Sequence, residues 1–71
     1  MVTARKMFEE LGYNTPAINP DNLIVYFAGF MRHRQEITFG LKTKEVRIDV
    51  RYARPELIKA IYKQCEELGW L

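Results

Sequence analysis

The strongest constraint on the fold is an alternation of apolar and polar residues in the middle of the chain. Apolar residues occupy every second position of 37–41 and, after the polar stretch 42–45, every second position of 46–52. Successive side chains of a β-strand point to opposite faces, so a period of two is typical of a strand with one buried face. The pattern predicts two amphipathic strands, 35–41 and 46–52, that form an antiparallel hairpin.

The register of this hairpin follows from the need to bring both apolar sets to the same face of the sheet. A loop centred on Thr43 and Lys44 meets that need. It predicts four cross-strand pairs, which are Phe39 with Ile48, Ile37 with Val50, Glu36 with Arg51, and Thr38 with Asp49. Favourable pairs of this kind stabilise a sheet by about 0.2–1 kcal/mol each.

A third strand is predicted over 23–31, where β-branched and aromatic residues are concentrated. This strand is apolar on both faces, so burial of one set of side chains leaves the other set outside. If Ile24 and Tyr26 face the core, Val25 and Phe27 lie on the opposite face. The pattern does not decide which set is buried.

Two helices are predicted to flank the strands, over 3–12 and 55–68. Apolar residues recur at intervals of three and four in both segments. Gly12 and Gly69 are suited to end the helices in a left-handed conformation, and Pro55 is suited to the first turn of the second helix.

These elements predict one α+β domain over 1–71, in the order helix, loop 13–22, three strands, helix. The strands form a three-stranded antiparallel meander, and both helices pack on its apolar face as a second layer. The predicted core consists of Met7, Phe8, Leu11, Ile37, Phe39, Leu41, Val46, Ile48, Val50, Leu57, Ile61, Cys65 and Leu68.

The residues that could support catalysis or metal binding are few. The chain has one cysteine, Cys65, and one histidine, His33, which lie on different predicted elements and are too few for a structural zinc site. The adjacent glutamates at 9–10 and 66–67 point about 100° apart on a helix, so neither pair is arranged for acid and base catalysis. The four glycines are isolated and form no phosphate-binding loop. We predict no enzyme activity, catalytic residue, cofactor or metal.

Charge and hydropathy restrict the cellular setting. The formal net charge of +2 is too small to predict nucleic-acid or membrane-surface binding by itself. The first ten residues lack the apolar stretch of a secretory signal, and the longest apolar segment, 23–31, is far shorter than the about 20 residues of a membrane-spanning helix. The sequence predicts a cytoplasmic protein without membrane contact.

The two ends of the chain resemble those of a known group of proteins. The segments 3–13 (TARKMFEELGY) and 61–70 (IYKQCEELGW) are similar to the ends of small proteins encoded by phages and prophages of Gram-positive bacteria. The resemblance implies a bacterial host cytoplasm and an accessory protein that acts by binding a macromolecule. It implies no catalytic residues.

Two surfaces are candidates for such binding. The first is the sheet face opposite the helices, where an apolar patch with arginines is predicted from Val25, Phe27, Thr38, Arg47 and Arg51. The second is the basic turn 32–34, which contains Arg32, His33 and Arg34 and is expected at the same end of the sheet as Arg54.

The first hypothesis is a non-enzymatic protein-binding module that uses the sheet face, with self-association into a dimer as one form of that contact. The alternative is binding of single-stranded or non-specific nucleic acid through Arg47, Arg51 and the turn 32–34. The sequence identifies no specific partner.

Overall fold

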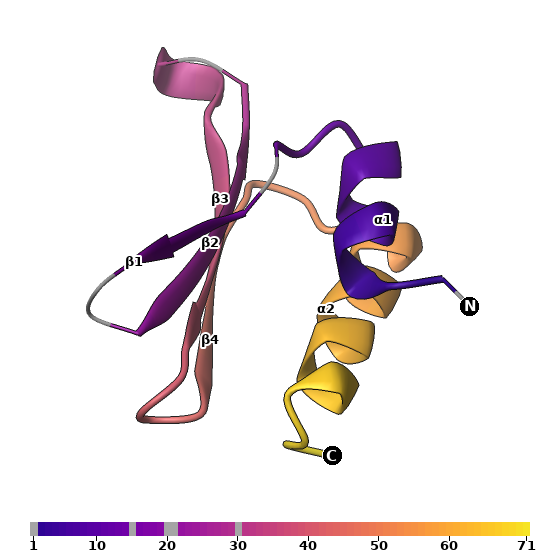
Figure 1. Cartoon of the computed structure of the whole chain (residues 1–71). Helices are drawn as coiled ribbons and strands as arrows, with labels where there is room; N and C mark the ends of the chain where they lie inside the picture. Colours follow the sequence, from indigo (N-terminus) through magenta and orange to yellow (C-terminus); the bar gives the residue numbers. More distant parts are fainter. Residues whose placement is uncertain (1, 15, 20–21, 30) are drawn as a thin grey trace.

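The computed structural model describes residues 2–14, 16–19, 22–29 and 31–71. It confirms an α+β architecture, in which two helices lie on one side of an antiparallel sheet (Figure 1). The elements are α1 (Ala4–Glu10), β1 (Ala17–Asn19), β2 (Leu23–Ala28), the 3-10 turn η1 (Met31–His33), β3 (Gln35–Gly40), β4 (Glu45–Asp49) and α2 (Pro55–Glu67).

The sheet has four strands in the order β1-β2-β3-β4, so the prediction of three strands was wrong. The additional strand, β1, lies in the segment predicted as the loop 13–22 and pairs with β2, with Ile18 opposite Ile24. Three residues are too few to show an alternating pattern, and β1 therefore left no signal in the sequence. Its presence makes β2 an interior strand.

The predicted strand 23–31 was too long, because β2 ends at Ala28. Gly29 has a φ of 83°, which turns the chain, and η1 follows from Met31. Phe30, also in the predicted strand, lies outside the described residues.

The predicted hairpin register was wrong by two residues. The structure pairs Ile37 with Ile48, Phe39 with Val46, Thr38 with Arg47, and Glu36 with Asp49. The turn is closed by a 2.9 Å hydrogen bond from the Lys44 N–H to the Gly40 carbonyl, with Lys44 in a left-handed conformation (φ 58°). Leu41 therefore lies in the turn instead of the core, and β4 ends at Asp49 instead of residue 52. A shift of two keeps every side chain on its predicted face, which is why the pattern alone did not fix the register.

An aromatic cluster joins the helices to the sheet. The ring of Phe8, from α1, stacks on Tyr26 of β2 with 3.8 Å between centroids, and Phe39 and Tyr13 meet it edge to face. Tyr26 is buried, so Val25 and Phe27 lie on the face away from the helices, which we call the open face. Ile48 was expected in the core but is 49% exposed, because the helices cover β2 and β3 more completely than β4.

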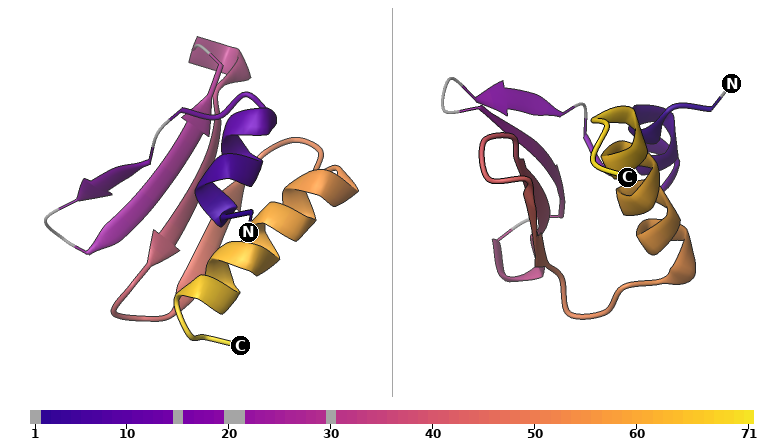
Figure 2. Two further views of the ribbon diagram at one scale, coloured as in Figure 1. Left: turned by 45° about the vertical axis from the view of Figure 1, so that its right-hand side comes forward. Right: turned by 90° about the horizontal axis from the view of Figure 1, so that it is seen from below.

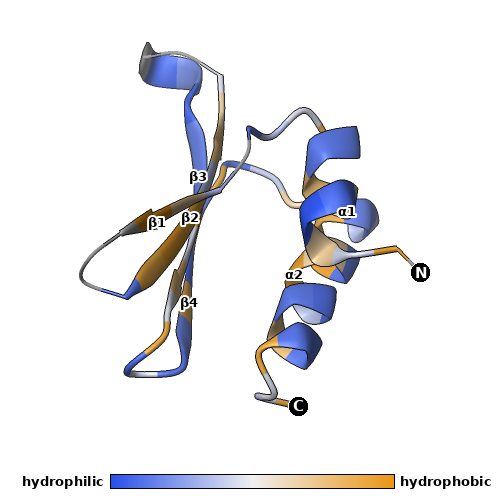
Figure 3. Ribbon diagram, viewed as in Figure 1, coloured by the Kyte–Doolittle hydropathy of each residue, from blue (hydrophilic) through white to orange (hydrophobic). Residues whose placement is uncertain are grey.

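The helices lie side by side (Figure 2). The hydroxyl of Thr3 accepts a hydrogen bond from the Lys6 N–H at the start of α1, and the Glu67 carboxylate of α2 accepts one from the Ala4 N–H at 2.8 Å. Hydrophobic residues of both helices, coloured orange in Figure 3, pack against the core, whereas Ile58 and Tyr62 of α2 are exposed. In the described part of the chain, neither helix has the length and apolar character needed to cross a membrane.

Candidate anion-binding site

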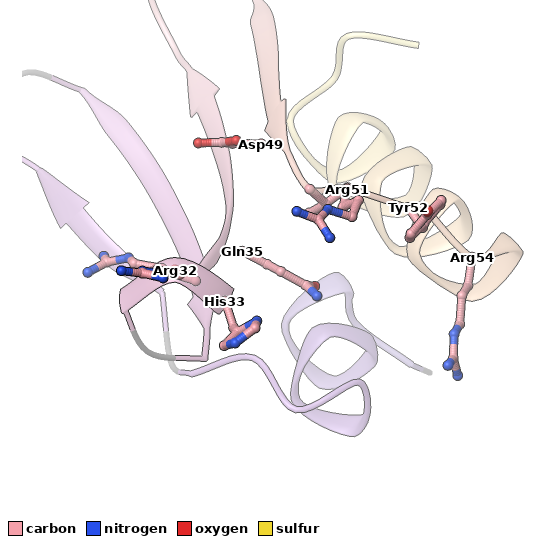
Figure 4. A pocket seen from close by; sticks show the side chains of 9 residues that line it. Arg32, His33, Gln35, Asp49, Arg51, Tyr52 and Arg54 are labelled. Atoms are coloured by element: carbon pink, nitrogen blue, oxygen red, sulfur yellow. The ribbon is translucent and has the colours of Figure 1, made fainter.

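A hollow of about 680 Å³ lies at the end of the sheet where η1 leads into β3 and β4 leads into the linker to α2 (Figure 4). We call it the basic hollow. It is lined by Arg32, His33, Arg34, Gln35, Asp49, Val50, Arg51, Tyr52 and Arg54. These residues come from two segments that are distant in sequence but adjacent in the sheet, because β3 and β4 are antiparallel neighbours.

Gly29 permits the turn that brings the first segment to the hollow. A Cβ atom at this position would lie 2.5 Å from the carbonyl oxygen of His33, closer than non-bonded atoms approach. The positive φ of Gly29 adds a second reason for glycine, because residues with a side chain rarely adopt it. The second segment needs no special turn, because it continues directly from β4 to Arg54, the residue before α2.

The side chains enter the hollow from different directions. Those of His33, Gln35 and Arg51 lie near its middle, with Arg32 and Arg54 on opposite sides (Figure 4). The Gln35 Oε1 atom also accepts a hydrogen bond from the Tyr13 hydroxyl at 3.0 Å, which fixes this side chain to the core. Tyr52 is 81% exposed and presents its ring to solvent.

Positive charge dominates the basic hollow. Four arginines and one carboxylate, that of Asp49, line it. The Arg34 guanidinium lies 4.4 Å above the ring of Phe27, and its Nε atom lies 3.5 Å from the Glu36 carboxylate. Among the described residues, the other three arginines form no salt bridge. These guanidinium groups retain donors that suit a phosphate or carboxylate.

The open face carries four of the residues predicted as an interaction surface. Val25 of β2, Thr38 of β3 and Arg47 of β4 are cross-strand neighbours and form one row of the open face. Phe27 of β2 begins the second row. That second row continues with two carboxylates, Glu36 and Asp49, which the sequence analysis placed on this face but paired with Arg51 and Thr38 instead of with each other. The corrected register gives the reason, because Asp49 was expected opposite Thr38.

Arg51 was predicted on the open face beside Arg47. It lies beyond the end of β4 and lines the basic hollow, together with Arg32 and Arg34. The sequence analysis expected the turn 32–34 and Arg54 at one end of the sheet, and the structure brings them there. It missed Arg51 and Tyr52 as members of the same group, because it extended β4 to residue 52.

Cys65 does not have the features of a reactive thiol. Burial raises the pKa of its thiol, which lowers the fraction of reactive thiolate. Over the described residues, no group of three or more His, Cys, Asp or Glu side chains is arranged to hold a metal ion.

Comparisons with known proteins add no assignment. No protein-family model, curated protein or solved structure matches this chain.

Proposed function

We propose that the chain is a small binding module whose basic hollow takes the phosphate backbone of a single-stranded nucleic acid. The observation that carries the proposal is the gathering of Arg32, Arg34, Arg51 and Arg54 around one hollow with a single carboxylate. The planar guanidinium group can donate two parallel hydrogen bonds to a phosphate.

Nucleic acid is favoured over an acidic protein because the hollow also presents an exposed aromatic ring. Tyr52 is 81% exposed, and unpaired bases stack on such rings in proteins that bind single strands. A duplex is a poorer fit, because the lining residues come from the segment from η1 to β3, from β4 and from the linker before α2, and neither α1 nor α2 contributes a residue that could enter a groove.

The test is fluorescence anisotropy with a labelled single-stranded oligonucleotide of mixed sequence, across a salt titration at neutral pH. The double variant Arg32→Gln, Arg51→Gln should bind about tenfold more weakly at low salt, with a salt dependence reduced by about one to two ion equivalents. Arg34 is left unchanged because it also packs on Phe27.

The matched control is Lys42→Gln, Lys59→Gln, which removes the same charge from exposed residues outside the hollow. This variant should bind nearly as well as the native chain. Equal losses in both double variants would show that net charge, and not the hollow, determines binding. Binding of polyglutamate in preference to the oligonucleotide would instead identify an acidic protein as the partner class.

A second candidate function is protein binding through the open face. It is favoured by the apolar residues Leu23, Val25 and Phe27, which lie on one side of β2 away from the helices and are only partly buried. The setting that the terminal segments resemble, a phage accessory protein in a bacterial cytoplasm, suits either candidate. A pull-down from bacterial lysate that retains the same proteins with Phe27→Glu as with the native chain would remove this candidate, with Tyr62→Glu as the control for an exposed aromatic on α2.

A further inference from the structure

The outer edge of β4 is an unpaired strand edge in the described part of the chain. β4 is the last strand of the sheet, and its other side pairs with β3. The backbone N–H and C=O groups along such an edge are free to pair with another strand. This edge is therefore a site where a further strand can extend the sheet.

The residues of β4 and the two that follow it are complementary to themselves. From Glu45 to Arg51 the sequence reads EVRIDVR, in which Ile48 is the centre. Residues at equal distances on either side of Ile48 are opposite in charge at 47 and 49 and at 45 and 51, and both are valine at 46 and 50. We propose that β4 pairs antiparallel with β4 of a second copy of this chain, about a two-fold axis at Ile48.

This pairing creates two symmetry-related contacts, each between Arg47 of one copy and Asp49 of the other. It also places the two Ile48 side chains next to each other on the same face of the sheet. Symmetric contacts of this kind use the same patch on both subunits. A register centred on Arg47 would keep the same faces but would put arginine opposite arginine and Glu45 opposite Asp49. Like charges directly opposite destabilise a strand pair, so the register centred on Ile48 is preferred.

The structure shows why a second copy suits this edge. On the open face Asp49 lies opposite Glu36, and Arg47 lies opposite Thr38. Over the residues that the structure describes, neither Arg47 nor Asp49 forms a salt bridge. The second copy would supply each with the opposite charge that its own sheet does not provide.

The other face of β4 adds an apolar contact. Ile48 points to the side of the helices but is 49% exposed, because the helices leave β4 partly uncovered. Two Ile48 side chains that meet at the axis would cover each other. The dimer would join two four-stranded sheets into one of eight strands, with one basic hollow beside the carboxyl end of each central β4.

The experiment is sedimentation equilibrium over a dilution series, with Arg47→Asp, Asp49→Arg and their equimolar mixture. The native chain should dimerise, and each variant alone should have a dimer dissociation constant raised about tenfold or more, since two attractive pairs become repulsive. The Arg47→Asp variant has aspartate at both 47 and 49, and the Asp49→Arg variant has arginine at both. A heterodimer of the two regains two attractive pairs, so the mixture should recover the native affinity. Circular dichroism checks that each variant is folded.

A control variant separates this edge from self-association through the open face. Phe27→Glu lies on β2 and should leave the dimer unchanged. A native chain that is monomeric throughout the dilution series would overturn the proposal. So would folded variants that dimerise like the native chain, or a mixture no tighter than the variants alone.

Discussion

Tyr26 shows how a single polar atom decides which face of a strand is buried. Phe27 is the more apolar of the two neighbours, yet Tyr26 is 1% exposed and Phe27 lies on the open face. The Tyr26 hydroxyl donates to the Oε1 atom of Gln64 at 2.6 Å, and Gln64 is itself buried on α2. Phe27 in turn is covered by the Arg34 guanidinium. Both contacts join residues distant in sequence, so the apolar pattern of β2 left the choice open.

Burial of Tyr26 predicts a loss of stability at alkaline pH. Burial, with the Glu67 carboxylate as a lesser cause, raises the pKa of Tyr26 from 10.0 to about 12. The unfolded chain loses this proton at lower pH than the folded one. The free energy of unfolding should therefore fall between pH 10 and 12, by about 1.4 kcal/mol for each pH unit. Below pH 10 this contribution is fully present.

Urea denaturation of the native chain and of Tyr26→Phe across this pH range measures the effect. The variant should lose less stability from pH 10 to 12 than the native chain. At neutral pH it should be about 1–3 kcal/mol less stable, because the buried Gln64 amide loses its partner. An equal alkaline loss in both proteins would assign the effect to other groups, among which Tyr13 also has a pKa raised by burial.

At the scale of elements, α1 depends on α2 for one of its terminal hydrogen bonds. α1 has seven residues, and a helix of this length is not stable in isolation. The Glu67 carboxylate, near the carboxyl end of α2, accepts the Ala4 N–H at 2.8 Å. The sequence analysis excluded Glu66 and Glu67 as a catalytic pair and assigned neither of them a structural contact. One of them joins the two helices, and 63 residues of separation hide that contact from any local pattern.

Glu67→Ala should lower the free energy of unfolding by about 1 kcal/mol, because an N–H at the start of a helix loses its acceptor. Glu66→Ala is the matched control. Its carboxylate makes an exposed contact with Lys63 at 3.9 Å, and such pairs contribute about 0–1 kcal/mol. Thermal denaturation measures both changes, and amide hydrogen exchange in α1 should rise in Glu67→Ala alone. Equal effects of the two variants would mean that the Glu67 contact does not stabilise α1.

At the scale of the whole molecule, the sequence predicted the features that depend on periodicity. The alternation in β3 and β4 identified the strands and their faces, because a strand has a physical period of two. The alternation did not fix the hairpin register, because a shift of two residues between β3 and β4 leaves every side chain on the same face. β1 has only three residues, and the basic hollow depends on where β4 ends, so neither was accessible to a pattern. The position of Arg54 beside the turn 32–34 was predictable, because it follows from strand direction alone.

A chain of 71 residues has a small core, so its net stability rests on few side chains. Phe8 is fully buried, and its ring contacts Tyr26, Phe39 and Tyr13, so that it connects α1 with the sheet. Replacing a buried phenylalanine with alanine costs about 3–5 kcal/mol, which approaches the whole stability of many small domains.

Phe8→Ala should therefore leave a large fraction of the chain unfolded at room temperature, as measured by circular dichroism and urea titration. Ile18→Ala provides the comparison, because Ile18 is 77% exposed on β1 and its loss should change stability by less than about 0.5 kcal/mol. If Phe8→Ala remained as stable as Ile18→Ala, the contact between the two layers would not depend on this ring. Because oligonucleotide binding and self-association both require the folded sheet, Phe8→Ala should abolish both, whereas Arg47→Asp leaves the lining of the basic hollow unchanged and should weaken self-association.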